Sequence, residues 1–421
     1  MLRAGGNAVD AAVAAVCMSF LAEPVLTGAG GGGFMLMHRP RAKPLLLDSF
    51  ARMPGTRIAT LTAADFQAIP IDFGDTVQSF HIGSASVATP GLLPMLFEVQ
   101  RNYGRIPMRE VLAPAQHAAR SGCTLNTLQA SFIHLLEPIL SSSDGCRALH
   151  SSATGLLNAG ENFINPELAN LLEFLELEGI DDWYYGDIAR SIASACQPGG
   201  LLQFSDMADA RMIERRPLSS PAMNGELLSN PAPSSGGTLI AFSLRLLDEL
   251  GKTSPEADTI LLAESLREAG SARTADFDSW VQKYGIQKTG VQNADFEDQF
   301  LSNERIKQHI NKISQRLDKQ VIDSVTESGN RHGSTTHISV LDGDGMAVSM
   351  TTSNGEGSGI VVPGTGIHLN NMLGEEDINP LGFHQQSGGE TLSSMMAPSM
   401  FLRAHRPAMI LGSGGSNRLR G

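Results

Sequence analysis

Residues 333–353 read GSTTHISVLDGDGMAVSMTTS, and this stretch decides how the rest of the chain is interpreted. From Thr335 onward polar and apolar side chains alternate, Gly343-Asp344-Gly345 turns the chain, and a second alternating run continues to Thr352. A period of two, interrupted by a short glycine-containing turn, is typical of a β-hairpin. The sequence therefore predicts a hairpin over residues 335–352.

The chemistry of this stretch lies at its first residue. A polar, glycine-containing segment, 327–334, runs directly into the strand, and its composition is typical of mobile, exposed chain. If the bond between Ser334 and Thr335 is cut, the freed α-amine, with a pKa of about 8, can accept the proton of the threonine hydroxyl. Thr335 could then act as a nucleophile without a histidine base. Because many strands begin with threonine, this signal alone favours a structural residue.

Composition limits the class of function. With 42% apolar and 18% charged residues, the 421-residue chain can bury a sizeable core, as three domains or as one large α/β unit. Its 44 acidic and 31 basic side chains give a net charge of −13. This charge argues against nucleic acid and against anionic membranes as partners, so small neutral or cationic ligands are favoured.

Cysteines and termini add further expectations. The four cysteines lie far apart without CxxC spacing, so we expect buried or semi-buried thiols rather than a zinc site or a disulfide framework. The apolar run 8–22 contains Asp10 and is too short to span a bilayer, and no charged region precedes it as in a signal peptide. Neither end has a terminal element, so we expect truncation at both ends.

Elsewhere, local signals predict the order of elements. A helix follows the Asn7 cap, a strand over 34–37 follows the glycine run 28–33, and two helices flank Tyr103-Gly104. Residues 166–250 read as further helices with a turn at 231–237, and residues 253–330 read as a solvated helical region.

Two glycine clusters and one acidic cluster are candidates for function. Residues 28–33 could cradle a phosphate, but no P-loop lysine or dinucleotide motif accompanies them, which disfavours nucleotide binding. Residues 412–416 could present consecutive N–H groups to an oxyanion. Residues 375–377, Glu-Glu-Asp, follow an apolar strand at 367–369 and by themselves read as a solvated loop.

Taken together, these blocks resemble the γ-glutamyltransferase (γ-glutamyltranspeptidase) family. They occur in family order and cover nearly the whole chain except about 253–330, and they comprise GGNAVDAAVA (5–14), TGAGGGGFML (27–36), PG (90–91), PSSGG (233–237), TTHISV (335–340), LSSM (392–395) and GGS (414–416).

The resemblance implies an α+β fold, the four-layer αββα sandwich of N-terminal-nucleophile hydrolases, made as a precursor that cuts itself. Cleavage between Ser334 and Thr335 would leave a large chain, 1–334, and a small chain, 335–421, that remain intertwined. Thr335 would then attack the γ-glutamyl amide of glutathione or a related compound and pass the acyl group to water or an amino acid. No metal and no organic cofactor is implied, and members of the family are commonly periplasmic or extracellular.

The resemblance also assigns roles within the site. Gly414 and Gly415 match the oxyanion-hole pair, and Ser353 stands where a threonine supports the nucleophile. Ser393, Ser394 and Arg52 match the residues that bind the α-carboxylate of the substrate. Asn354 and Glu375 match those that bind its α-ammonium.

Two departures keep alternatives open. Arg52 is shifted relative to the family's Asp-Phe-Arg pattern, and Met372 stands where a polar residue often helps to bind the ammonium. One alternative is a relative of the same fold that hydrolyses glutaryl-type acylamides or poly-γ-glutamate. Another is an inactive homologue that serves as a binding or structural subunit.

Overall fold

Two antiparallel sheets form the centre of the molecule in the computed structural model, which describes residues 1–55, 62, 65–74, 77–251, 255–285, 294–318 and 335–414. The first sheet has the order β12 (Thr336–Leu341), β13 (Ala347–Ser353), β1 (Gly32–His38), β2 (Leu45–Ser49) and β9 (Ile213–Arg215). The second has the order β10 (Leu218–Ala222), β11 (Gly225–Ser229), β16 (Ser399–Arg403) and β17 (Arg406–Leu411).

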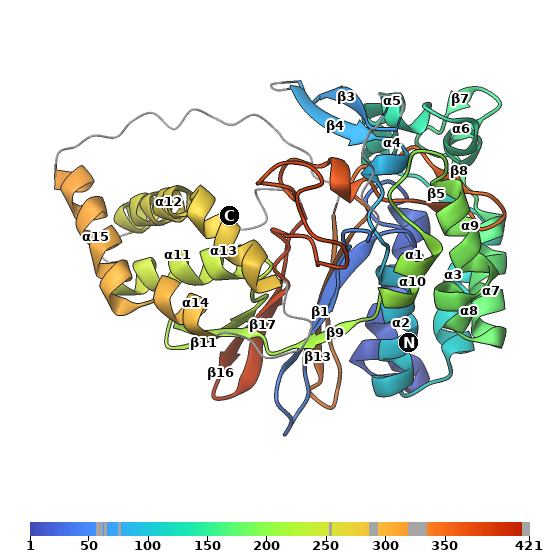
Figure 1. Ribbon diagram of the computed structural model, residues 1–421. Coiled ribbons are helices and arrows are strands. Elements are labelled where there is room, and N and C mark those ends of the chain that lie inside the picture. The colour runs from blue at the N-terminus through green and yellow to red at the C-terminus, as the bar shows by residue number, and fades with distance from the viewer. Residues whose placement is uncertain are drawn as a thin grey trace.

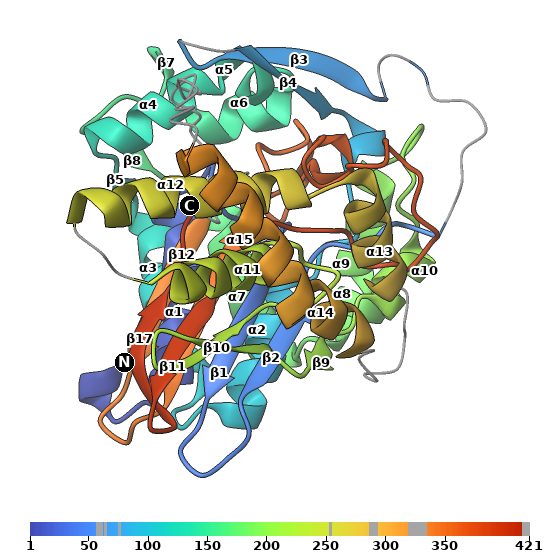
Figure 2. The same cartoon turned by 90° about the vertical axis from the view of Figure 1, so that its left-hand side faces the viewer.

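Helices cover the outer face of each sheet, which gives four layers (Figure 1). Beside the first sheet lie α1 (Ala8–Ala22), α2 (Leu92–Tyr103), α3 (Met108–Ser121), α7 (Pro166–Glu178), α8 (Asp181–Tyr185), α9 (Asp187–Ala195) and α10 (Phe204–Asp209). Beside the second lie α11 (Gly236–Leu250), α12 (Pro255–Ala272), α13 (Ala275–Gly285), α14 (Ala294–Phe300) and α15 (Asn303–Asp318). The view of Figure 2 shows α11 and α15 crossing in front of the strands. The expected αββα sandwich is thus confirmed.

Shorter elements cap one end of the sandwich (Figure 1). They are β3 (Gln67–Asp72), β4 (Val77–Ile82), η2 (Ser84–Ser86), β5 (Cys123–Thr124), α4 (Thr127–Leu135), α5 (Glu137–Leu140), α6 (Asp144–His150), β6 (Ser151–Ser152), β7 (Gly155–Leu156), β8 (Asn162–Phe163), β14 (Val361–Val362), β15 (Ile367–His368) and η3 (Met372–Gly374), with η1 (Leu2–Ala4) near the N-terminus.

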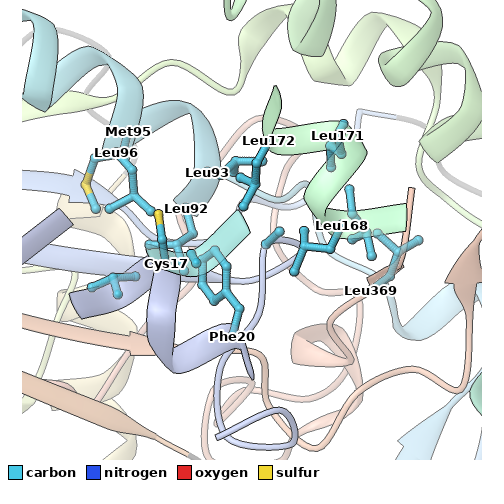
Figure 3. Close-up of a cluster of buried hydrophobic side chains, with 14 of the residues drawn as sticks. Cys17, Phe20, Leu92, Leu93, Met95, Leu96, Leu168, Leu171, Leu172 and Leu369 are labelled. Carbon is cyan, nitrogen blue, oxygen red and sulfur yellow. The ribbon is translucent and has the colours of Figure 1, made fainter. Parts of the chain in front are cut away.

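Alternation along β1 divides the core in two. Met35 and Met37 join the cluster under α1 and α2, whereas Phe34 and Leu36 face the cluster shared with the second sheet and α11. Figure 3 shows the first cluster, where Cys17 and Phe20 of α1 meet leucines of α2 and α7. A strand with apolar residues on both faces must lie between two layers, and this fixes β1 at the centre.

Most local predictions hold. Asn7 closes a capping box at the start of α1, two helices flank Gly104, and the hairpin appears as β12 and β13. The cysteines are free, with Cys123 half-buried and the other three buried. Within the part of the chain that the structure describes, no helix is long and apolar enough to cross a membrane.

Two predictions are wrong. Residues 213–229 are the strands β9, β10 and β11 rather than helices. In β10 the inward residues are Leu218, Ser220 and Ala222, so small and polar side chains hide the alternation from a hydrophobicity pattern.

The second wrong prediction concerns the helical segment. Helices α12 to α15 are not merely solvated, because Phe277, Val281, Phe300 and Ile313 are buried against α11. The segment therefore forms the outer layer of the second sheet. The predicted mobile stretch 327–334 lies outside the described residues.

Candidate active site

Thr335 immediately precedes β12, beside the end of β13. The pairing of Thr336 with Thr352 places Thr335 and Ser353 next to each other, one residue further along each strand. Thr336 Oγ1 donates a hydrogen bond to the carboxylate of Glu23, which follows α1. Thr336, the first residue of β12, is therefore bonded both to the sheet and to the residue at the end of α1.

The glycine run 28–33 brings β1 close to this pair. A Cβ on Gly31 would lie 2.2 Å from the carbonyl oxygen of Ser353, and one on Gly33 would lie 2.8 Å from that of Thr351. Thr27, just before the run, shares a 2.9 Å hydrogen bond between its hydroxyl and that of Thr352. Since side chains cannot fit here, the glycines serve close packing against β13.

A second glycine segment meets Thr335 from the other sheet. After β17 ends at Leu411, Gly414 comes so near that a Cβ there would lie 2.3 Å from the Thr335 carbonyl oxygen. The structure thus brings Gly414 to Thr335. Gly415 and Ser334 lie outside the described residues.

His337 holds these parts together, and the sequence assigned it no role. Its Nδ1 lies 2.8 Å from Thr351 Oγ1 and its Nε2 lies 2.9 Å from Ser339 Oγ. Gly412 packs against the ring, because a Cβ on it would lie 2.2 Å from the imidazole. Burial lowers the pKa of His337 to about 4, so the ring is neutral near pH 7.

A cluster of buried polar and acidic groups lies next to Ser353. The Oγ of Ser353 accepts a 3.0 Å hydrogen bond from the N–H of Gly355, and Asn354 Nδ2 donates to the carbonyl of His368 at 3.1 Å. Asn354 Oδ1 is buried without a hydrogen-bond partner among the described residues. At Gly355, where φ is +62°, a Cβ would lie 2.3 Å from Glu375 Oε1.

The charge state of Glu375 reflects these surroundings. Its Oε1 is buried and has no hydrogen-bond partner in the described part of the chain. Burial, and secondarily the nearby carboxylates of Glu356 and Asp377, raise the pKa of Glu375 well above its ordinary value. Glu376 is exposed, as expected for a solvated loop, but that expectation is wrong for Glu375.

Glu356 and Asn371 belong to the same buried cluster, and neither was predicted from the sequence. The N–H of Glu356 donates to Asn371 Oδ1 at 2.9 Å, and Glu356 is buried. The sequence signal that could have identified Glu356 is its position as an acidic residue between the glycines of the run 353–359. Met372, in contrast, is fully buried in a hydrophobic cluster.

Ser393 and Ser394 lie in a separate buried segment. The carbonyl of Ser394 accepts hydrogen bonds from Ser235 N at 2.8 Å and Ser234 Oγ at 2.9 Å. Next to them, the backbone of Thr391 forms a bridge with Arg52. The PSSGG turn, 233–237, thus supports the serine segment.

The side chain of Arg52 binds groups outside the serine segment. Its guanidinium donates to the carbonyl of Asp209 at 2.6 Å and to that of Arg211. The backbone of Arg52 therefore reaches the serine segment, while its side chain binds the last residue of α10 and a residue just after that helix.

Comparisons with known proteins agree with this arrangement. The sequence profile of the Gamma-glutamyltranspeptidase family matches residues 1–420. The chain belongs to this family. It is 29% identical to the Acylase ACY 1 proenzyme of Pseudomonas sp. (strain SE83), with 100% of this chain and 74% of the relative covered. It is 28% identical to the Glutathione hydrolase proenzyme of Pseudomonas aeruginosa, with the same coverage.

A solved structure supports the fold of this gamma-glutamyltranspeptidase family member. The cephalosporin acylase from Bacillus halodurans superposes with a TM-score of 0.76 at 23% identity, covering 98% of this chain and 74% of the other. At this identity the likeness speaks for the fold alone.

Proposed function

We propose that this protein is an autoprocessing γ-glutamyl hydrolase or transferase. It cleaves the γ-glutamyl amide bond of glutathione or a related small molecule through an acyl-enzyme on Thr335, and passes the acyl group to water or an amino acid. Membership in the family and the relative named Glutathione hydrolase proenzyme support this reaction class.

The observation that carries the choice of substrate is the acidic cluster beside Ser353, formed by Asn354, Glu356 and Glu375. Asn354 and Glu375 offer oxygen acceptors without hydrogen-bond partners in the described chain, and Glu356 adds a second carboxylate nearby. A buried ammonium would satisfy these acceptors and relieve the repulsion between the carboxylates. A γ-glutamyl donor brings such an ammonium, whereas a glutaryl donor does not.

Processing would create the nucleophile. The Thr335 hydroxyl attacks the carbonyl of Ser334, the peptide bond becomes an ester, and water releases the new N-terminus. The product is a large chain, 1–334, that stays packed around a small chain, 335–421. The intertwined sheets support this, since β13 from the small chain pairs with β1 from the large one, and β16 from the small chain pairs with β11 from the large one.

Turnover would use the same hydroxyl. The free α-amine of Thr335 accepts its proton, Ser353 supports the hydroxyl, and the N–H groups of Gly414 and Gly415 stabilise the oxyanion. Asn354 and Glu375 hold the donor's ammonium. Ser393 and Ser394 hold its carboxylate, and Arg52 contributes to that end if its guanidinium turns away from the carbonyls it now binds.

Processing is tested on a denaturing gel. Because chains of 334 and 87 residues separate readily, the wild-type protein should give bands near ~37 and ~10 kDa at about 110 Da per residue, and Thr335→Ala should stay uncut. Sequencing the small band from its N-terminus should start at Thr335. A Thr336→Ser variant serves as the control, because it keeps a hydroxyl beside Glu23 and leaves Thr335 intact.

Two other functions remain to be compared. The relative named Acylase ACY 1 proenzyme favours an acylase that accepts glutaryl-type amides, and poly-γ-glutamate hydrolysis belongs to the same class. An inactive binding subunit is the other, and a wild-type chain that never splits and never releases product would favour it.

The donor is identified by comparing two chromogenic amides. We expect release of p-nitroaniline from the γ-glutamyl conjugate and little from the glutaryl conjugate, which lacks the α-amine. Glu375→Gln should raise KM about tenfold or more for the γ-glutamyl conjugate, the effect of one lost charge-assisted hydrogen bond, and leave the glutaryl rate unchanged. Turnover of the glutaryl form alone would assign the protein to the acylases.

A further inference from the structure

A basic hollow lies at the end of the sandwich away from Thr335. It has a volume of about 800 Å³ and lies where β2 and β9 of one sheet approach β10 and β11 of the other. Strand β1 begins beside Ser353 and ends at His38, so its length separates the hollow from the candidate active site by about 20 Å. The hollow is therefore separate from the candidate active site, and its volume suits a small ligand.

Its charge is opposite to that of the whole chain. The four basic side chains that line it are Arg39, Lys43, Arg215 and Arg216. Two acids also line it, but each already accepts a hydrogen bond from a hydroxyl: Glu214 from Tyr103 at 3.2 Å and Glu226 from Ser219 at 2.6 Å. In a chain of net charge −13, this local excess of positive charge needs an explanation.

The buried arginine in this hollow has spare donor capacity. The side chain of Arg215 is only 6% exposed, and its Nε binds Asp48 Oδ2 at 2.7 Å. Its Nη2 has no hydrogen-bond partner among the described residues, and neither has the buried Nε of Arg39. A buried N–H without an acceptor is unfavourable, so both guanidinium groups would gain from an oxygen ligand.

Two further features complete a cationic rim. The guanidinium of Arg39 lies 4.9 Å from the ring centre of Tyr103, which fixes its orientation. Lys43 is exposed and takes part in none of the ion pairs found among the described residues. An ammonium and two guanidinium groups around one hollow are the donors that carboxylates and phosphates bind.

We propose that this hollow binds a small oxyanion, a carboxylate or a phosphate, with Arg39, Lys43 and Arg215 as its ligands. Inorganic phosphate and glutarate are the probes, measured by calorimetry against sodium chloride at the same ionic strength, because salt alone screens surface charge. Comparing the two distinguishes a phosphate site from a carboxylate site.

The variants locate the binding. Arg39→Gln and Lys43→Gln should each weaken binding of the better probe about tenfold or more, the effect of one lost charge-assisted hydrogen bond. Arg41→Gln removes the same charge from an exposed neighbour that does not line the hollow, and should change nothing. Arg215 is left intact, because its removal would leave Asp48 buried without its partner.

Two results would overturn the proposal. One is that neither probe binds more tightly than chloride. The other is that Arg41→Gln weakens binding as much as Arg39→Gln, which would mean general attraction to positive charge. Since neither result depends on Thr335, both are independent of the proposed enzyme function.

Discussion

At the scale of single residues, the candidate site depends on close approaches of backbone. Gly414 meets the carbonyl of Thr335, Gly31 meets that of Ser353, and Gly355 lies against the carboxyl of Glu375. In each case a methyl group would come closer than real Cβ atoms come to their neighbours. These glycines are therefore required by space, and at Gly355 also by its positive φ.

The first prediction concerns Gly414. Gly414→Ala should lower both the rate of self-cleavage and turnover about 100-fold or more, because the new methyl group displaces the segment that would stabilise the oxyanion. Gel densitometry against time and release of p-nitroaniline measure the two rates. Gly343→Ala is the matched control, since a Cβ there meets nothing within 4 Å. Normal processing of Gly414→Ala would remove this segment from the mechanism.

A second residue-scale prediction concerns pH. The raised pKa of Glu375 means that it is protonated more readily than an ordinary glutamate in the free protein. An ammonium ligand prefers the ionised form, so affinity for a γ-glutamyl donor should increase as pH rises through that pKa. Measuring KM from pH 5 to 8 tests this, and Glu375→Gln should lose that part of the dependence.

At the scale of elements, the β12–β13 hairpin joins the parts of the site. Asp342 in its turn accepts hydrogen bonds from Asp344 N and Met346 N at 2.9 Å, and from Ala8 N of α1 at 3.0 Å. At the other end His337 links the hairpin to Gly412. The hairpin is thus anchored at its turn to the first helix and near Thr335 to the second sheet.

His337→Phe tests this link. The ring volume is kept, but Thr351 and Ser339 lose their hydrogen bonds to the imidazole, so we expect about 1–3 kcal/mol lower free energy of unfolding. Urea unfolding of the Thr335→Ala precursor avoids complications from cleavage. His117→Phe is the control, because His117 is exposed on α3. Equal stability of the two variants would show that the link contributes little.

At the scale of the whole molecule, a carboxyl group of the outer helical layer contacts the turn beside the site. Glu297 of α14 accepts a 3.1 Å hydrogen bond from Ala232 N, at the start of the turn that supports Ser394. Burial is the main cause that raises the pKa of Glu297 to about 7; Asp298 raises it further, while Arg216 and the hydrogen bond lower it. Glu297 therefore titrates near neutral pH at a contact between the outer helical layer and the turn beside Ser394.

The sign of the effect on stability follows from linkage. Between an ordinary pKa of 4.5 and about 7, the folded chain holds more protons at Glu297 than the unfolded chain, so stability falls as pH rises through this window. The loss amounts to at most about 3 kcal/mol. Glu297→Gln, which can still accept from Ala232, should flatten this part of the dependence in urea unfolding at pH 5 and pH 8. An unchanged slope would assign the dependence to other groups.

The sequence predicted an element correctly where a local pattern of residues is compatible with only one kind of local structure. The Asn7 cap, the glycine run and the period-two hairpin each predict their element correctly. Strand β10 was missed because its inward residues are small or polar. His337, Glu356 and Asn371 were missed because each gains its role from partners distant in the sequence or across a turn.

By itself the sequence determined the family, because its motifs are contiguous, and it placed Thr335 where a strand begins, because the period of two is local; the four-layer class followed only from the resemblance to that family. Only the tertiary structure decided what surrounds that threonine. Packing of the two sheets brings Gly414 against Thr335, the segments that follow β13 and η3 bring Glu375 against Gly355, and the side chain of Arg52 binds the carbonyls of Asp209 and Arg211. Such contacts join residues tens to hundreds of positions apart, and no local pattern records them.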